Sequence, residues 1–189
     1  VLEVLEGPVT QAARALLGRR LRSEVDGEAT EVVLTEVEAY GGADDPASHA
    51  FGGETRRNRT MFGPAGRLYV YRSYGIHWCM NVSCGPAGTA AAVLLRGGIP
   101  VAGEEVMARR RGRSDHLADG PGKLCQALGV TGVHDGLWLG EAPIRLLTAE
   151  PVGGTVTAGP RVGIGKAVDR PWRFVLDPGE GLKGPDSPR

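Results

Sequence analysis

The most regular pattern of hydrophobic and polar positions lies in residues 31–40, which are rich in β-branched side chains. In a β-strand, successive side chains point to opposite faces. Glu36, Glu38 and Tyr40 are therefore predicted to share one face, while the apolar side chains between them point to the other. The segment predicts a strand that presents two carboxylates and a phenol side by side.

A helical pattern comes before this strand. Alanine and leucine recur at helical spacing across residues 10–22 with arginines between them, which predicts an amphipathic helix with a basic outer side. After the strand, residues 41–66 predict one long loop. Loops of this length usually line a site or a binding surface.

Two β-like runs, 67–72 and 77–83, are separated by the sequence Ser-Tyr-Gly-Ile. The glycine can adopt a positive φ angle, so these runs predict a β-hairpin with Tyr74 at or near its tip. An aromatic ring at such a tip is unfavourable in water. Tyr74 is therefore expected either to meet a partner or to pack on a neighbouring loop.

The middle of the chain predicts one more strand and two helices. Residues 90–95 form an apolar run typical of a central strand, which would end at Arg96. Residues 104–113 predict a helix that ends in arginines. The sequence Gly-Pro-Gly-Lys then opens a short helix over 124–128, whose first amides together with Lys123 would suit a phosphate.

Towards the end of the chain, short apolar runs alternate with turn signals. They predict strands over residues 137–139, 144–147, 162–165 and 173–176. From residue 177 onwards the chain is rich in proline, glycine and charge, so residues 177–189 are expected to form a flexible tail.

The order of these elements predicts an α+β fold. We expect a single mixed domain over residues 1–189, with a curved, mostly antiparallel sheet flanked by helices and a protruding β-hairpin. A chain of 189 residues with 41% hydrophobic content is long enough for one packed core.

Charge and hydropathy limit the possible location of the protein in the cell and its possible binding partners. The formal net charge is zero, so any argument for nucleic acid or membrane must rest on local charge. The chain has no apolar run long enough to span a bilayer and does not begin with a basic segment followed by an apolar core. We therefore expect a soluble, cytoplasmic protein that does not bind membranes.

The cysteines argue against disulfides and metal. Cys79, Cys84 and Cys125 are odd in number and lack disulfide-like spacing, so they are expected to be reduced and mostly buried. His77 lies near two of them, but the spacing matches no common zinc pattern and we predict no metal site.

All four tyrosines of the chain lie in the same third of the sequence as Glu38 and His49, so these side chains could act together. Tyr40, His49 and Tyr71 can sandwich a flat heteroaromatic ring, because offset stacking suits an electron-poor π system. A carboxylate such as Glu38 can deprotonate a water or stabilise positive charge that develops on a sugar. Arg96 can hold that water, so these parts fit hydrolysis of an N-glycosidic bond.

Taken singly, the same residues have ordinary interpretations. A strand glutamate usually lies on a solvated face, tyrosines at alternate positions usually pack a core edge, and a loop histidine usually has no special role. Asn81 can simply cap a turn. Arg96 can form a surface ion pair worth under about 1 kcal/mol.

A series of longer motifs runs in order along nearly the whole chain. They are TEVEAY at 35–40, SH at 48–49, RRNRTMF at 56–62, GRLYVY at 66–71, YG at 74–75, CMN at 79–81, VLLR at 93–96, GPGKLCQAL at 120–128 and RVGIG at 161–165. With these motifs the chain resembles the alkyladenine DNA glycosylase family, the mammalian-type 3-methyladenine DNA glycosylases.

The resemblance implies roles for the catalytic residues. Glu38 is expected to be the general base that activates water, and Arg96 with the backbone carbonyl of Val162 to help hold that water. The motif has no lysine near Glu38, so the resemblance implies a monofunctional glycosylase that leaves an abasic site. No cofactor is expected.

The resemblance also implies a pocket for a flipped base. Tyr40, His49 and Tyr71 are expected to stack on the base, with the backbone of His49 able to read its edge. Asn81 is expected at the pocket wall, where it would exclude a normal guanine by clashing with its exocyclic amino group. Cation–π attraction of roughly 0.5–2 kcal/mol would favour alkylated, cationic purines.

The implied partner is double-stranded DNA that contains damaged purines such as 3-methyladenine, 7-methylguanine, hypoxanthine or ethenoadenine. The implied fold inserts its β-hairpin into the minor groove, with Tyr74 as the wedge that fills the gap left by the flipped base. A monomer is expected, because one domain suffices to meet a duplex. The other expected DNA contacts are Ile76, His77, Arg56, Arg57, Arg59 and Lys123.

Two other functions remain open. The first is a damaged-DNA-binding module without chemistry, against which the presence of Glu38 and Arg96 argues. The second is a small-molecule nucleoside or glycoside hydrolase that uses Glu36 and Glu38. Alternate strand positions place those carboxylates side by side instead of across a sugar, and the wedge tyrosine would then have no use.

Overall fold

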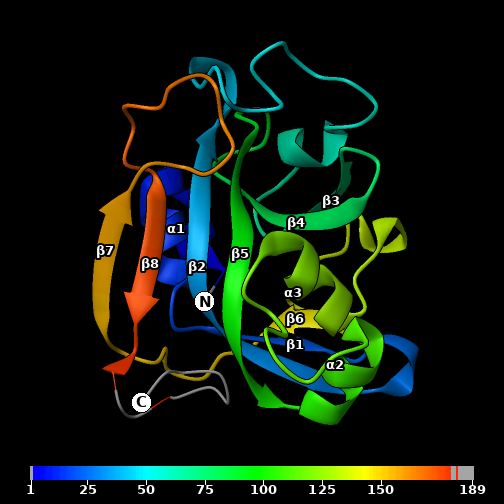
Figure 1. Ribbon diagram of the computed structural model, residues 1–189. Coiled ribbons are helices and arrows are strands. Elements are labelled where there is room, and N and C mark those ends of the chain that lie inside the picture. Colours follow the sequence, from blue (N-terminus) through cyan, green and yellow to red (C-terminus); the bar gives the residue numbers. More distant parts are fainter. Residues whose placement is uncertain (1, 180–181, 183–189) are drawn as a thin grey trace.

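The computed structural model describes residues 2–179 and residue 182, and its elements are labelled in Figure 1. Eight strands form one sheet in the order β3-β4-β5-β2-β1-β6, with β8 paired to β2 and β7 paired to β8. The strands are β1 (Arg20–Ser23), β2 (Thr30–Gly41), β3 (Leu68–Ser73), β4 (His77–Cys84), β5 (Ala91–Ala102), β6 (Ile144–Leu146), β7 (Thr155–Gly159) and β8 (Arg173–Asp177). The α-helices are α1 (Val9–Leu16), α2 (Glu104–Arg111) and α3 (Pro121–Leu128).

Strand β2 is the centre of the sheet. It pairs with β5 along most of its length, while β1 pairs with its first half and β8 with its second half. All three pairings are antiparallel, and the β2–β5 register shifts between Leu34 and Glu36 and again between Glu36 and Val37. Such bulges bend and twist a strand. The predicted mixed fold with a curved antiparallel sheet is therefore confirmed.

Helices cover the sheet from two sides. Figure 1 shows α1 behind β2 and α3 in front, next to β5. The buried residues Ala12, Ala13 and Leu16 of α1 belong to the main hydrophobic core, as do Leu124 and Leu128 of α3. This packing explains the apolar spacing that predicted the first helix.

The first helix is shorter than predicted. Helical spacing continues to residue 22, but α1 ends at Leu16 and residues Arg20–Ser23 form strand β1 instead. The backbone is already extended at Leu17, where ψ is 140°. Gly18 follows with a φ angle of 76°, and its amide bonds to Leu34 O at 2.8 Å. Pairing of β1 with both β2 and β6 therefore overrides the local helical pattern.

Gly18→Ala is expected to destabilise the fold strongly. The left-handed conformation alone costs a residue with a Cβ about 1–2 kcal/mol. A Cβ at this position would also lie 2.1 Å from Val152 O, so the backbone must move. Chemical denaturation should show a lower free energy of unfolding.

Gly27→Ala is the matched control for this experiment. Gly27 has a similar φ angle of 75° but nothing within 4 Å of an added Cβ. Gly27→Ala should therefore lower the free energy of unfolding only by the cost of the left-handed backbone conformation. If the two variants lost the same free energy of unfolding, the close approach of Val152 O to Gly18 would be contradicted.

Other strand predictions need correction. Strand β5 does not end at Arg96 but continues to Ala102, because residues 97–102 pair with the first half of β2. The predicted strand at 162–165 is irregular, and the strand in this part of the chain is β7, which was not predicted. The predicted strand at 137–139 amounts to an isolated bridge between Arg67 and Trp138.

The predicted tail begins slightly too early. Asp177 is the last residue of β8 and pairs with Thr155. Beyond residue 179 only residue 182 is described, so the rest of the predicted tail lies outside the described residues. Cys79, Cys84 and Cys125 are free and buried, as predicted. Within the described part of the chain, no helix combines the length and apolar character needed to cross a membrane.

Candidate active site

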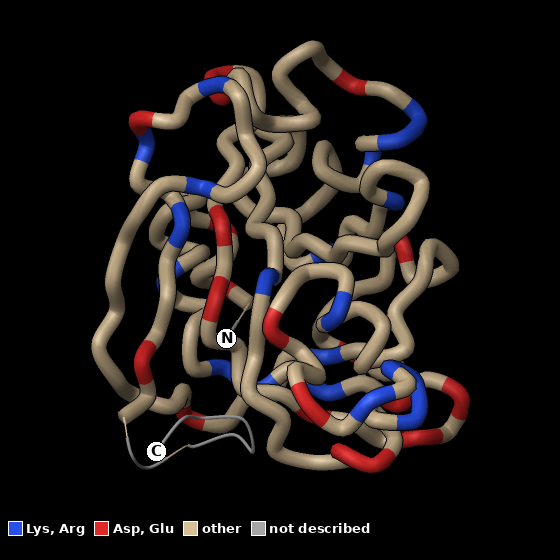
Figure 2. The backbone as a smooth tube through the Cα atoms, in the orientation of Figure 1, with Lys and Arg blue, Asp and Glu red and all other residues tan. Residues whose placement is uncertain are grey.

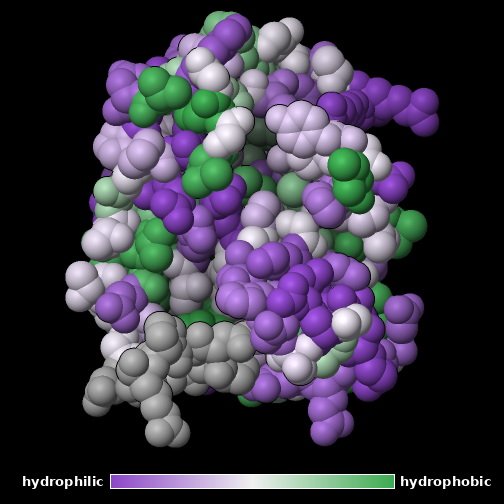
Figure 3. All heavy atoms as spheres, in the orientation of Figure 1, coloured by the Kyte–Doolittle hydropathy of each residue, from purple (hydrophilic) through white to green (hydrophobic). Residues whose placement is uncertain are grey.

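A pocket of about 570 Å³ opens where the second half of β2 and the first half of β5 meet the β3–β4 hairpin. Its volume falls in the range of small-molecule sites. Figure 3 shows the hollow in this face of the molecule, between the loop that precedes β8 and the hairpin. Predicted site residues from distant parts of the sequence meet in its lining, namely Tyr40, His49, Arg57, Tyr71, Tyr74, Asn81, Arg96 and Val162.

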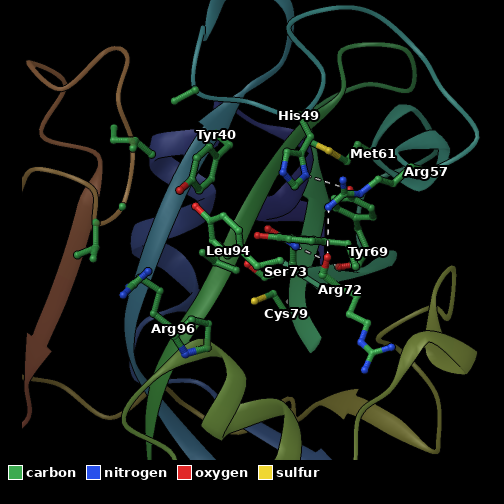
Figure 4. Close-up of a pocket in the computed structure, with 18 of the residues that line it drawn as sticks. Tyr40, His49, Arg57, Met61, Tyr69, Arg72, Ser73, Cys79, Leu94 and Arg96 are labelled. Carbon is green, nitrogen blue, oxygen red and sulfur yellow. Dashed lines mark hydrogen bonds between the residues drawn. The ribbon is translucent and has the colours of Figure 1, made fainter. Parts of the chain in front are cut away.

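One wall of the pocket is aromatic. The rings of Tyr69 and Tyr71 are stacked with centroids 5.5 Å apart, and His49 meets Tyr71 edge-on at 4.5 Å. Figure 4 shows His49 and Tyr69 on this side of the pocket, with Tyr40 and Arg96 across from them. The opening between Tyr40 and this wall suits a flat ring.

Tyr69 was not among the predicted site residues. It lines the pocket, and its hydroxyl lies 3.1 Å from Nδ1 of His49. The signal that could have identified it is the alternation of β3, because Tyr69 and Tyr71 are two positions apart and share a face. Of these two tyrosines, only Tyr71 was predicted to belong to the stacking pocket.

His49 is held in its neutral form. Burial lowers the pKa of His49 below its ordinary value of 6.5, and the neighbouring Arg57 guanidinium lowers it further. A neutral imidazole can exchange a hydrogen bond with Tyr69 without placing a charge against the aromatic wall.

The low pKa of His49 predicts a loss of stability in acid. The unfolded chain binds the proton more readily than the folded chain, so the stability contribution is complete above about pH 6.5 and is lost as the pH falls through the folded-state pKa. In thermal unfolding between pH 7 and pH 5, His49→Gln should show a smaller fall in Tm than the wild type. Equal falls in both proteins would contradict this linkage.

Glu38 is fully buried directly behind the pocket lining. Its Oε2 accepts a hydrogen bond from the Tyr40 hydroxyl at 2.8 Å, and its Oε1 accepts one from the Val162 amide at 2.7 Å. Arg96 Nη1 lies 3.4 Å from Oε1. All three partners line the pocket, so the carboxylate is oriented at its edge.

Tyr40 remains a hydrogen-bond donor at neutral pH. Burial raises the pKa of Tyr40 above its ordinary value of 10, and the adjacent Glu38 carboxylate raises it further. The sequence predicted that Tyr40 would stack on a ligand. The structure adds that its hydroxyl fixes one oxygen of Glu38.

Arg96 is shared between two carboxylates. Its Nε donates to Glu36 Oε1 at 2.8 Å, and Arg173 Nε donates to the same oxygen at 2.7 Å. Burial raises the pKa of Glu36, but the hydrogen bonds from Arg173 and Arg96 outweigh it and hold the pKa below its ordinary value. Glu36 is therefore a charged anchor for Arg96 that does not itself line the pocket.

Asn81, on β4, lines the pocket and is only 4% exposed. Its Nδ2 donates to Tyr69 O at 3.1 Å, which fixes the orientation of the amide. An amide held in this way is a rigid steric boundary for anything that enters.

Tyr74 lies at the tip of the hairpin, as predicted. Tyr74 and Gly75 both have positive φ angles, 48° and 70°, and Ile76 N bonds to Ser73 O at 2.9 Å. Tyr74 is 93% exposed and Ile76 67% exposed, so the tip does not pack on a neighbouring loop. His77 at the start of β4 is also exposed.

Of the four predicted basic contacts, Arg57 lines the pocket, whereas Arg56, Arg59 and Lys123 do not. Figure 2 shows basic positions on the loop after β2 and on α2 and α3. Arg57 lines the pocket with its guanidinium 5.4 Å from the centre of the Tyr71 ring. Arg56 is exposed, Arg59 pairs with Glu54 and Lys123 pairs with Asp119.

A buried ion pair that the sequence analysis did not single out lies behind Tyr40. Arg161 donates from both terminal nitrogens to the two oxygens of Asp45, at 2.5 and 2.8 Å. Both side chains are fully buried. Only the RVGIG motif hinted at Arg161, because ordinary spacing cannot pair residues so far apart in sequence.

A family of known proteins matches nearly the whole chain. Residues 3–179 match the family model described as methylpurine-DNA glycosylase. Among the residues that the structure describes, no group of three histidine, cysteine, aspartate or glutamate side chains is arranged to hold a metal ion.

Three bacterial proteins illustrate the similarity, and each carries the name "Putative 3-methyladenine DNA glycosylase". That of Rhodopseudomonas palustris strain BisB18 is 52% identical over 170 residues, covering 89% of this chain and 82% of its own length. That of Frankia casuarinae is 47% identical over 202 residues, covering 100% of this chain and 93% of its own length. That of Agrobacterium fabrum is 52% identical over 167 residues, covering 87% and 82%. The chain therefore belongs to the methylpurine-DNA glycosylase family.

Proposed function

We propose that this protein is a monofunctional DNA glycosylase that removes alkylated or deaminated purines from double-stranded DNA. Its substrates would be of the 3-methyladenine, 7-methylguanine, hypoxanthine and ethenoadenine class. The observation that carries the proposal is the Glu38 carboxylate, held by Tyr40, Val162 and Arg96 at the edge of an aromatic pocket in a chain of this family.

The target base must leave the duplex before it can react. A base inside the stack is out of reach of a buried carboxylate, so the nucleotide turns out of the helix at a cost of a few kcal/mol. This cost is smaller for a damaged or mispaired base, which gives a first level of selectivity. The flipped purine would then lie between Tyr40 and the wall formed by His49 and Tyr71.

Glu38 would act as the general base in the hydrolytic step. A water beside Glu38 gives its proton to the carboxylate while its oxygen forms a bond to C1′ of the sugar. The bond from C1′ to the base nitrogen breaks, and its electron pair leaves with the base. A cationic alkylated base leaves as a neutral molecule, whereas a neutral base such as hypoxanthine must gain a proton at a ring nitrogen.

The residues around Glu38 would position this water. Arg96 is anchored by Glu36 and can donate to the water or to the carboxylate. The amide of Val162 already binds Glu38, and its carbonyl is proposed as a further acceptor for the water. No lysine is needed, so the product is an abasic site and no Schiff base forms.

Selectivity within the pocket would come from Asn81 and from stacking. The fixed amide of Asn81 would clash with the exocyclic amino group of a normal guanine. 7-Methylguanine carries the same amino group, and a difference of this kind is worth only about 1–3 kcal/mol, so the clash would disfavour 7-methylguanine without excluding it completely.

The exposed hairpin would enter the minor groove beside the flipped nucleotide. Tyr74 would fill the gap in the stack, and Ile76 and His77 would contact the groove next to it. Arg56, Arg57, Arg59 and Lys123 would contact phosphates. We further propose that the protein works as a single-domain monomer, at the nucleoid in the cytoplasm, where its DNA substrate would be.

The test is single-turnover base release from duplexes that each contain one hypoxanthine, ethenoadenine or 7-methylguanine. We expect release of the free base and an abasic strand that alkali cleaves, with no covalent complex trapped by borohydride. An undamaged duplex is the control. Tight binding of the damaged duplexes without release would favour the damaged-DNA-binding module instead.

A further inference from the structure

Arg161, which is paired with Asp45 in the interior, adjoins the two groups that donate hydrogen bonds to the Glu38 carboxylate, Tyr40 and Val162. On one side, the Arg161 guanidinium lies 4.6 Å from the centre of the Tyr40 ring, on which it stacks. On the other side, Arg161 directly precedes Val162, whose amide donates to Glu38 at 2.7 Å. One side chain therefore supports the two hydrogen-bond donors of the carboxylate.

Further contacts leave Arg161 little freedom. Its Nη1 also donates to Ala39 O at 2.9 Å, in the strand between Glu38 and Tyr40. Its guanidinium lies 5.4 Å from the centre of the Trp172 ring. Asp45 is itself fixed, because its carboxylate accepts the amides of Gly41 and Ala47. The pair thus joins the end of β2, the loop after it and the loop that carries Val162.

We propose that Arg161, held by Asp45, is a positioning residue that sets the geometry of Glu38 through Tyr40 and Val162. The inference rests on the proposed function, because Arg161 and Asp45 do not touch the substrate and would act only by positioning the proposed general base. A planar guanidinium can bind a carboxylate with two parallel hydrogen bonds and stack on a ring at the same time, which a lysine cannot do.

The magnitude follows from the sensitivity of catalysis to distance. A displacement of about 1 Å in a catalytic group can cost on the order of 100-fold in rate. Arg161→Lys keeps a positive charge near Asp45 but loses the planar guanidinium with its two parallel hydrogen bonds. The Tyr40 ring and the Val162 amide are then no longer held in place. We expect the single-turnover rate at saturating enzyme to fall by about 10- to 100-fold.

A second quantity separates positioning from a merely structural role. With enzyme in excess over duplex, the plateau rate reports the geometry of bound enzyme, and the half-saturating concentration reports how much enzyme can bind. Positioning lowers the plateau rate and leaves the half-saturating concentration within about twofold. Partial unfolding raises the half-saturating concentration and leaves the plateau rate unchanged.

Arg170→Lys is the matched control. Arg170 lies in the same loop, with Nη1 3.9 Å from Asp45 Oδ1 and its guanidinium 4.8 Å from the centre of the Trp172 ring. Its Nη2 donates a hydrogen bond to Asp44 O at 2.9 Å, and none of these contacts reaches Tyr40 or Val162. The plateau rate of this variant should stay close to that of the wild type.

The experiment distinguishes each way in which the inference could fail. A wild type that releases no base would refute the proposed function itself. A wild type that releases base, with an unchanged plateau rate in Arg161→Lys, would overturn the inference alone. If Arg161→Lys does not fold, Asp45→Asn, which keeps the shape of the side chain, should show the same lowered plateau rate. Failure of both variants to fold while Arg170→Lys folds would also overturn the inference, because the pair would then be a structural element.

Discussion

Glu38→Gln is expected to reduce the single-turnover rate of base release by about 10²- to 10⁴-fold, the usual contribution of a general base. Glutamine keeps the size and shape of the side chain and can still accept a hydrogen bond from the Val162 amide. It cannot take a proton from water. The affinity for a damaged duplex should therefore remain close to that of the wild type, and a gel or anisotropy titration would measure it beside the rate.

Glu36→Gln is the matched control for this substitution. Glu36 lies two residues earlier on the same face of β2 and also contacts Arg96. It is an anchor and not the base, so its loss should slow base release far less than the loss of Glu38. Equal rates in the two variants would contradict the assignment, and full activity of Glu38→Gln would remove the general base from the mechanism.

Tyr74→Gly is expected to weaken both damaged-duplex binding and base release without destabilising the fold. Stacking of an aromatic side chain on a base is worth about 1–3 kcal/mol, which corresponds to roughly a 5- to 150-fold loss. Tyr74 is 93% exposed and has a φ angle of 48°, so it adds little packing and adopts a backbone conformation that glycine tolerates better. The Tm should accordingly stay the same or rise.

The control for Tyr74 is another exposed apolar side chain. Val133 is 83% exposed and is not part of the pocket lining. Val133→Ala should leave duplex binding and base release unchanged. If Tyr74→Gly also left both unchanged, the hairpin tip would have no part in opening the stack and the proposed wedge would be wrong.

The sequence by itself determined the features that depend on neighbouring residues. Strand β2 follows from the alternation of residues 31–40, and the hairpin with Tyr74 at its tip follows from the glycine at its turn. Both depend on local backbone preferences, which short segments carry with them. The motifs along the chain also identified the family, and they named Glu38, Tyr40, His49, Tyr71, Asn81 and Arg96, most of which meet at one pocket.

The tertiary structure decided the features that depend on long-range pairing. Residues 20–23 have helical spacing but form β1, because this segment pairs with β2 and β6. Strand β5 continues past Arg96 because β2 supplies hydrogen bonds to its second half. Val162 meets Glu38 through its amide, whereas the sequence suggested only its carbonyl. Arg161 binds Asp45, which is 116 residues away in the chain. No local pattern encodes such a contact, because it arises only when the curved sheet brings the two loops together.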